Sequence, residues 1–295
     1  MDGLLYPVPV PQRKRPPGHL EFIPFVALLP AIMAPLDLAS RRDLPDRGLR
    51  RVLDSFLNLL YPDDCLACAA AVSRATHCSI CERCWQKILE LRIQPPWCPS
   101  CGLPYPPSTE AGSHLCGDCI LRPPPFEGAR AFGYYAAELS VATQALKFMG
   151  RRNIALLLAP LMASAFLGSW QRRDFDLVVP VPLHPRRARA RGYNQAALLA
   201  RSFAGVVALP VDEKVLVRMR DTPPQVGLTN RERLENLRQA FRCLNPREVH
   251  GRRVLLLDDV MTTGATITSA SLALLAAGAA RISVLALART VTRHE

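Results

Sequence analysis

One segment, residues 254–266, constrains the fold of this chain more than any other. It consists of the apolar run Val254–Leu257, the adjacent acids Asp258 and Asp259, then Val260 and Met261, and the hydroxyl-rich turn Thr262, Thr263, Gly264, Ala265 and Thr266. A short apolar run that begins with a β-branched residue is typical of a buried parallel strand. The apolar spacing that follows predicts a helix over 267–277. The segment therefore predicts a strand–turn–helix unit of an open α/β sheet.

The acids and the turn together have the chemistry of a site for a phosphorylated sugar. We expect Asp258 and Asp259 at the carboxyl end of the strand, where open α/β sheets bind their ligands. Carboxylates accept hydrogen bonds from sugar hydroxyls or hold magnesium through water. A turn that opens a helix offers N–H groups and the positive end of the helix dipole to a phosphate. An ordinary helix cap would explain Thr262 or Thr263, but not two successive acids after an apolar strand.

This segment resembles, at all thirteen positions, the phosphoribosyl-pyrophosphate signature of type I phosphoribosyltransferases. The resemblance implies that Asp258 and Asp259 are the catalytic carboxylates and bind the ribose hydroxyls. It implies in the same way that residues 262–266 bind the 5′-phosphate. A Walker-type loop does not fit, because no lysine follows Gly264 and no upstream glycine completes that loop.

A second apolar run, 176–182, precedes a strongly basic segment. The candidates for binding the substrate here are Arg186, Arg187 and Arg191. Guanidinium groups bind phosphate bidentately, and positive charge at a helix start is unfavourable without an anion. We therefore expect about two of the arginines between 186 and 191 to face pyrophosphate. A solvated basic helix start is the alternative. Lys147, at the end of an expected helix over 141–148, is equally compatible with a helix-end cation and with a residue of the site.

Nine of the ten cysteines lie between positions 65 and 119, mostly in C-x-x-C steps. Two such steps direct four thiolates at one zinc ion. The sequence predicts two structural zinc sites, one formed by Cys65, Cys68, Cys81 and Cys84 and the other by Cys98, Cys101, Cys116 and Cys119. Cys78 with Cys81 is an alternative step, which leaves the role of Cys78 and His77 open. The odd number of cysteines in this region disfavours a disulfide framework, but their spacing alone does not exclude an iron–sulfur cluster. Cys243 lies far from the others in the sequence and is expected to be a small buried hydrophobe.

Charge and composition divide the rest of the chain. The net charge is +12, and eight thiolates on two zinc ions would lower it to about +8, which still favours a polyanionic partner. We predict a disordered or non-native extension over 1–55, a double zinc-ribbon module over 56–125 and a phosphoribosyltransferase-type domain over 126–295. The apolar stretch 22–33 contains prolines and is too short to span a bilayer, so we expect a cytoplasmic protein without membrane insertion.

Three secondary elements and one loop complete the sequence-based predictions. We expect an edge strand near 131–135, a helix over 153–166 and a strand near 215–218. The Pro-Pro segment over 221–238 has the polar character of a functional loop, which in a phosphoribosyltransferase would be the lid that excludes water.

Taken together, the motifs resemble those of the ComF competence family over residues 60–291. They are the paired cysteines, Val179–Gln195, Asp221–Leu228, Arg233 with Asn236 and Ala240-Phe241, and the 254–266 segment. The resemblance implies a Rossmann-like parallel sheet behind a zinc-ribbon module. It also implies binding of phosphoribosyl pyrophosphate with Mg²⁺ and a role in the uptake of transforming DNA. Implied partners are single-stranded DNA and competence or recombination proteins.

The rival function is a non-catalytic zinc protein that binds single-stranded DNA and uses the pocket as a ligand sensor. The acceptor base and the oligomeric state stay open.

Overall fold

The computed structural model describes residues 63–72, 79–106, 112–220 and 240–291. The expected extension over 1–55, the residues His77 and Cys78, and the expected lid over 221–238 therefore lie outside the described residues. Within the described ranges, no helix combines the length and the apolar character needed to cross a membrane.

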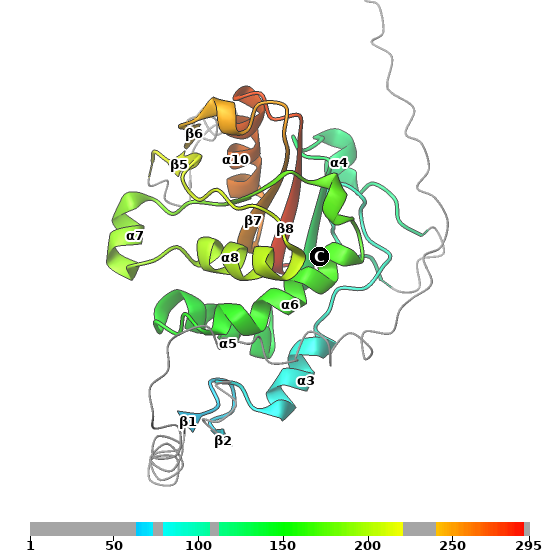
Figure 1. Ribbon diagram of the computed structural model, residues 1–295. Helices are drawn as coiled ribbons and strands as arrows, with labels where there is room; N and C mark the ends of the chain where they lie inside the picture. The colour runs from blue at the N-terminus through cyan, green and yellow to red at the C-terminus, as the bar shows by residue number, and fades with distance from the viewer. Residues whose placement is uncertain (1–62, 73–78, 107–111, 221–239, 292–295) are drawn as a thin grey trace, which may run out of the picture. The chain divides into compact units, whose positions relative to one another are not determined.

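An all-parallel sheet of four strands, in the order β3-β8-β7-β4, forms the centre of the fold (Figure 1). In chain order the strands are β3 (Gly128–Tyr134), β4 (Leu177–Pro180), β7 (Arg253–Met261) and β8 (Arg281–Arg289). The two central strands are buried on both faces, which explains why their sequences are almost continuously apolar. The predicted α/β class with a parallel sheet is confirmed.

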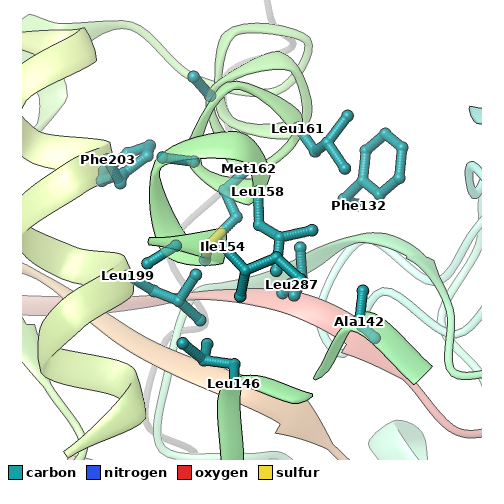
Figure 2. Close-up of a cluster of buried hydrophobic side chains, with 14 of the residues drawn as sticks. Phe132, Ala142, Leu146, Ile154, Leu158, Leu161, Met162, Leu199, Phe203 and Leu287 are labelled. Carbon is teal, nitrogen blue, oxygen red and sulfur yellow. The ribbon is translucent and has the colours of Figure 1, made fainter. Parts of the chain in front are cut away.

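Helices cover both faces of this sheet. They are α5 (Ala137–Phe148), α6 (Ile154–Leu167), α8 (Gln195–Val207) and α10 (Ala265–Ala276). Helices α6 and α8 pack on one face, with α5 beside α6, whereas α10 packs on the other face. Figure 2 shows the core on the first face, where Phe132 and Leu287 of the sheet lie near Leu158 and Met162 of α6 and Leu199 of α8. The helix predicted over 153–166 is confirmed as α6.

Several shorter elements surround the sheet. They are β1 (Asp63–Asp64), β2 (Ala71–Val72), α3 (Glu82–Glu90), α4 (Gly117–Leu121), the 3-10 turn η2 (Arg172–Asp174), α7 (Pro185–Arg191), β5 (Leu216–Arg218), β6 (Phe241–Cys243) and the 3-10 turn η3 (Pro246–Glu248). The strand predicted near 215–218 is β5, which pairs antiparallel with β6 in a separate two-stranded sheet.

The cysteine-rich region covers the outer edge of β3. The Ala129 amide donates to the Ser100 carbonyl over 2.7 Å, and the Tyr134 amide donates to the Leu91 carbonyl over 2.9 Å. The predicted edge strand near 131–135 is thus confirmed as the edge of the four-stranded sheet, but its backbone is already paired. Since an open edge invites pairing with other chains, this cover protects the sheet.

The structure corrects where the strand of the 254–266 segment ends. The two acids are expected at the carboxyl end of the strand and do lie near it, but β7 continues through both of them to Met261. Its pairing with β4 stops at Leu257, whereas its pairing with β8 continues to Met261. The acids therefore lie inside β7 but beyond the end of β4. Helix α10 also begins earlier than predicted, at Ala265.

Candidate functional site

The two acids of β7 belong to opposite faces of the sheet. Leu255 and Leu257 belong to the core beneath α6, and the 3.1 Å contact with Lys147 of α5 places Asp259 on the same side. Neighbouring side chains of a strand point to opposite faces, so Asp258 lies on the side of Leu256, which belongs to the core beneath α10. The pair therefore flanks the strand instead of forming one cluster of two neighbouring carboxylates.

Lys147, from the last turn of α5, pairs with one of these acids. Its Nζ lies 3.1 Å from Oδ2 of Asp259, and the side chains are only 19% and 12% exposed. The sequence left two interpretations of Lys147 open, a helix-end cation or a residue of the site. The contact with Asp259 places it in the candidate site. Sequence reasoning did not include it among the site residues because 112 positions separate it from Asp259.

Asp258, the other acid of β7, has a raised pKa. Burial and the neighbouring Asp259 carboxylate raise the pKa of Asp258, while the Asp259 amide, Lys147 and Arg218 act in the opposite direction. The Asp259 amide donates to Oδ1 of Asp258 over 2.8 Å, which fixes the orientation of that carboxyl group. A carboxyl group in such a place is stabilised by a cation or by hydroxyl donors, which are the partners that a ribose with magnesium would bring.

The hydroxyl-rich turn directly follows β7 and opens α10. Gly264 is the N-cap residue and has a φ of +79°, a left-handed conformation that glycine adopts without strain. The amide of Ala265 donates to Oγ1 of Thr263 over 3.4 Å. Thr262, Thr263 and Ala265 are exposed, so the start of α10 faces solvent. The first amides of a helix have no partner within the helix, and this turn therefore presents donors beside the acids.

The basic segment forms a short helix, α7, after the carboxyl end of β4. Nδ1 of His184 accepts from the Arg186 amide over 3.3 Å at its start, and Gly192, with a φ of +74°, ends it. No residue of α7 is buried, and short connections join it to β4, which ends at Pro180, and to α8, which begins at Gln195. The structure thus brings the acids, the turn and Lys147 together, and Arg191 at the end of α7 lies over the ring of Phe148, the neighbour of Lys147 in the chain. Arg186 and Arg187 lie at the start of α7. That these arginines bind a ligand stays a prediction.

Eight cysteines gather into the two predicted tetrads. Within each tetrad the sulfur atoms all lie within 4.8 Å of one another. Sγ of Cys68 lies 3.6 Å from that of Cys81, and Sγ of Cys101 lies 3.7 Å from that of Cys116. These separations exceed a disulfide bond of about 2.05 Å and match the spacing of about 3.8 Å between thiolates at the corners of a zinc tetrahedron. The residues therefore fit zinc.

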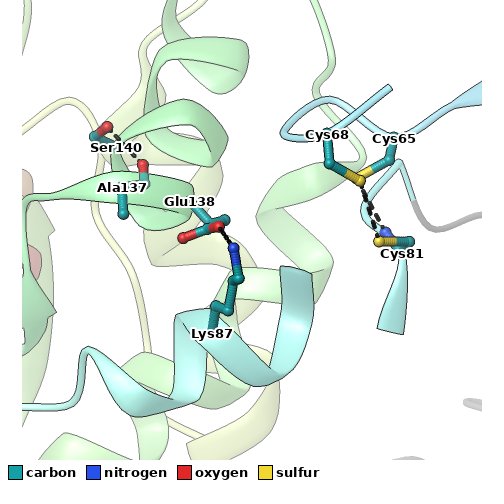
Figure 3. A network of polar contacts seen from close by, with 7 residues as sticks. All are labelled: Cys65, Cys68, Cys81, Lys87, Ala137, Glu138 and Ser140. Carbon is teal, nitrogen blue, oxygen red and sulfur yellow. Dashed lines mark hydrogen bonds and ion pairs between the residues drawn. The ribbon is translucent and has the colours of Figure 1, made fainter. Parts of the chain in front are cut away.

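Backbone amides support the thiolates of both tetrads. The Cys81 amide donates to Sγ of Cys65 over 3.3 Å, in the cluster shown in Figure 3, and the Cys116 amide donates to Sγ of Cys98 over 3.4 Å. Burial and the neighbouring thiols raise the pKa of Cys84, because several adjacent thiolates repel one another without a cation. A bound metal ion would remove this repulsion.

Cys243 lies outside both tetrads, in β6. We expected a buried hydrophobe, and the side chain is half-buried beside the apolar core under α10. Burial raises the pKa of its thiol, so this cysteine is disposed to stay protonated.

Comparisons with known proteins agree with this arrangement. A family described as the double zinc ribbon domain matches residues 56–120, and the phosphoribosyl transferase domain matches residues 189–294. "DNA utilization protein YhgH" of Salmonella typhi is 35% identical over 240 residues, which cover 79% of this chain and 100% of the relative. The protein of that name in Escherichia coli strain K12 is 36% identical over 218 residues, covering 72% and 90% of the two chains.

A competence protein is among the relatives as well. "Competence protein F" of Haemophilus influenzae is 31% identical over 229 residues, which cover 76% of this chain and 96% of the relative. These relatives match over nearly their whole length, and the two matched domains stand in the order that the cysteine tetrads and the parallel sheet occupy in the structure. This chain belongs to the ComF competence family, in which a double zinc ribbon precedes a phosphoribosyltransferase domain.

Proposed function

We propose that this protein binds phosphoribosyl pyrophosphate, together with Mg²⁺, at the carboxyl end of β7. The observation that carries the proposal is the junction of β7 and α10, where two acids adjoin a turn that offers amide donors. Carboxylates disfavour phosphate but suit ribose hydroxyls, whereas the start of α10 suits a phosphate. A ligand that presents hydroxyls and a phosphate at neighbouring points satisfies both parts of the site.

Each residue has a role in this proposal. Asp258 and Asp259 hold the ribose hydroxyls, and residues 262–266 hold the 5′-phosphate through backbone amides. Arg186, Arg187 and Arg191 approach the diphosphate from α7. Magnesium fits here because Lys147 pairs with Asp259, and the carboxyl group of Asp258 on the other side of β7 can bind a divalent cation through water. Magnesium would neutralise charge on the leaving diphosphate.

Transfer at this site would need no covalent nucleophile. The reaction would depend on stabilising charge as the bond between the ribose carbon and the diphosphate loosens. The carboxylates orient the ribose, and the cations of the site stabilise the departing anion. The names of the relatives refer to DNA utilization and to competence, so we propose that the protein acts in the uptake and handling of DNA. The zinc tetrads have no open coordination position and serve a structural role.

Calorimetry of phosphoribosyl pyrophosphate with magnesium tests the binding site. The double variant Asp258→Asn with Asp259→Asn should lose binding by at least about a hundredfold, since each charge-assisted hydrogen bond contributes about 1.5–3 kcal/mol. Asp118→Asn is a matched control, because Asp118 is an exposed acid of α4, 74% exposed, outside the site. Equal affinity in the double variant and the control would refute the assignment.

A second measurement separates a transferase from a ligand sensor. Radiolabelled pyrophosphate should exchange into phosphoribosyl pyrophosphate in the presence of a suitable acceptor base if transfer occurs. Binding without exchange for every nucleobase tested would favour the sensor. Fluorescence anisotropy with a labelled oligonucleotide across a salt series then measures the proposed binding of single-stranded DNA, which should weaken steeply with salt.

A further inference from the structure

Beside the candidate site, the segment that connects α5 to α6 contacts the end of α7 and the residues that follow it, and each segment places an arginine over an aromatic ring of the other. The Arg152 guanidinium, from the connection between α5 and α6, lies over the Tyr193 ring at 4.7 Å. In return, the Arg191 guanidinium at the end of α7 lies over the Phe148 ring, also at 4.7 Å. The Tyr193 hydroxyl donates to the Leu146 carbonyl over 2.6 Å. We call this set of five residues the buckle.

The buckle fixes the backbone on both sides of Lys147, since Leu146 and Phe148 are its neighbours in the chain. A lysine in the last turn of a helix ordinarily extends into solvent. Lys147 instead keeps about a fifth of its side chain exposed and directs its ammonium group at Asp259. The buckle also joins Lys147 to α7, the helix that carries Arg186 and Arg187.

Lys147 and the turn at α10 approach β7 from opposite faces of the sheet. Asp259 and α5 lie on the side of α6, whereas Asp258 and α10 lie on the other side. In phosphoribosyl pyrophosphate the diphosphate and the 5′-phosphate leave the ribose from opposite ends. A ribose held by the two acids would therefore direct one phosphate group to α10 and the other towards Lys147.

We propose that Lys147 binds the diphosphate of phosphoribosyl pyrophosphate, an inference that rests on the proposed function above. In the structure Lys147 pairs with Asp259. When the ribose hydroxyls and magnesium bind the two acids, Asp259 no longer depends on Lys147 as its partner. The ammonium group of Lys147 then turns to the diphosphate. The buckle holds Lys147 close enough to bind either Asp259 or the diphosphate. It also places the end of α7 next to Lys147.

Calorimetry with two ligands tests this role in the full-length zinc-loaded protein with magnesium present. Phosphoribosyl pyrophosphate carries the diphosphate, and ribose 5-phosphate lacks it. Lys147→Met keeps the aliphatic stem but removes the charge, so it should weaken binding of phosphoribosyl pyrophosphate about tenfold to a hundredfold. Binding of ribose 5-phosphate should change less than about twofold. Lys147→Arg keeps the charge and should retain most of the affinity.

Lys87→Met is the matched control, because Lys87 pairs with Glu138 away from the site. Its affinities should equal those of the wild type, and circular dichroism with zinc analysis verifies that every variant is folded. Equal losses of affinity for both ligands in Lys147→Met would show that Lys147 only positions Asp259. Unchanged affinities would show that Lys147 has no role in binding. Either result overturns the inference and leaves the proposed function standing. A wild-type protein that binds neither ligand would overturn both.

Discussion

The two cysteine tetrads share a spacing pattern, but they are attached to the rest of the protein in different ways. In the first tetrad, Cys65 and Cys84 belong to the large core beneath α6, together with Ile80 and Ile88. In the second, three cysteines form a small cluster of their own with Leu103 and Tyr105 at its margin. The first tetrad is therefore attached by apolar packing, whereas the second has little apolar contact with the sheet.

Directed polar contacts attach the second tetrad instead. The Ser100 carbonyl accepts from the Ala129 amide in β3, and the carbonyl of Cys101 accepts from Nη1 of Arg289 in β8. The same guanidinium group lies 3.9 Å from Sδ of Met261, at the end of β7 beside the candidate site. Apolar packing tolerates small shifts, but backbone hydrogen bonds do not. We therefore expect the sheet to respond differently when each attachment is damaged.

Removal of zinc should have the largest effect, because structural zinc contributes folding free energy directly. We expect two zinc ions per chain by elemental analysis. After chelation, hydrogen exchange should accelerate at the Ala129 and Tyr134 amides, whose acceptors lie in the cysteine-rich region, and less at Leu256 in the central strand. Cys98→Ser should expose the Ala129 amide in the same way, whereas Cys65→Ser should not. Iron in place of zinc, or unchanged exchange at Ala129, would contradict this.

The apolar attachment is tested by Ile88→Ala in α3. Ile88 is completely buried, so the truncation should lower the free energy of unfolding by about 2–5 kcal/mol through lost packing and a cavity. Leu121→Ala in α4 removes a comparable side chain that is 79% exposed and should cost little. Urea denaturation measures both values. Similar losses in the two variants would mean that α3 is not anchored in the core as the packing indicates.

The polar attachment is tested at Gly102, between the second tetrad and β3. A Cβ atom there would lie 2.3 Å from the Ala129 carbonyl oxygen, and the backbone φ is +72°. Gly112 has a similar φ of +62°, but open space surrounds its position. Alanine at either site carries the same backbone strain, so Gly102→Ala should destabilise the protein by about 1–3 kcal/mol more than Gly112→Ala. Equal melting temperatures would argue against the close approach.

The smallest effect is expected from the ion pair that joins α3 to α5. Nζ of Lys87 lies 2.8 Å from Oε1 of Glu138 (Figure 3), and exposure screens the pair. The hydrogen bond from Lys87 lowers the pKa of Glu138. A lowered carboxyl pKa contributes stability above the unfolded pKa and loses it as the pH falls through the folded pKa. The small loss in Lys87→Met should therefore be seen at neutral pH and disappear in acid or high salt. A loss that persists in acid would point to packing.

Local features of the sequence determined much of this protein. The apolar run before Asp258 predicts a central strand, because a strand covered on both faces needs apolar residues on both sides. The C-x-x-C spacing predicts the tetrads, because two thiolates of one knuckle reach a single metal ion. The turn at Gly264 is likewise a local matter of backbone conformation. The acids lie near the carboxyl end of the strand as expected, but the strand continues past them to Met261, because β8 continues pairing where β4 has stopped.

Tertiary structure alone decided how these parts meet. The pair between Lys147 and Asp259 joins residues far apart in the chain, and no local pattern distinguishes that lysine from a solvated one. The cover on β3 depends on backbone hydrogen bonds, to which every residue except proline can donate, so the sequence carries no mark of the partner. Residue types at short spacing determine the local turns, strands and metal-binding steps, so the sequence predicts these. Contacts between residues far apart in the chain depend on how the buried surfaces pack together, which the tertiary structure alone decides.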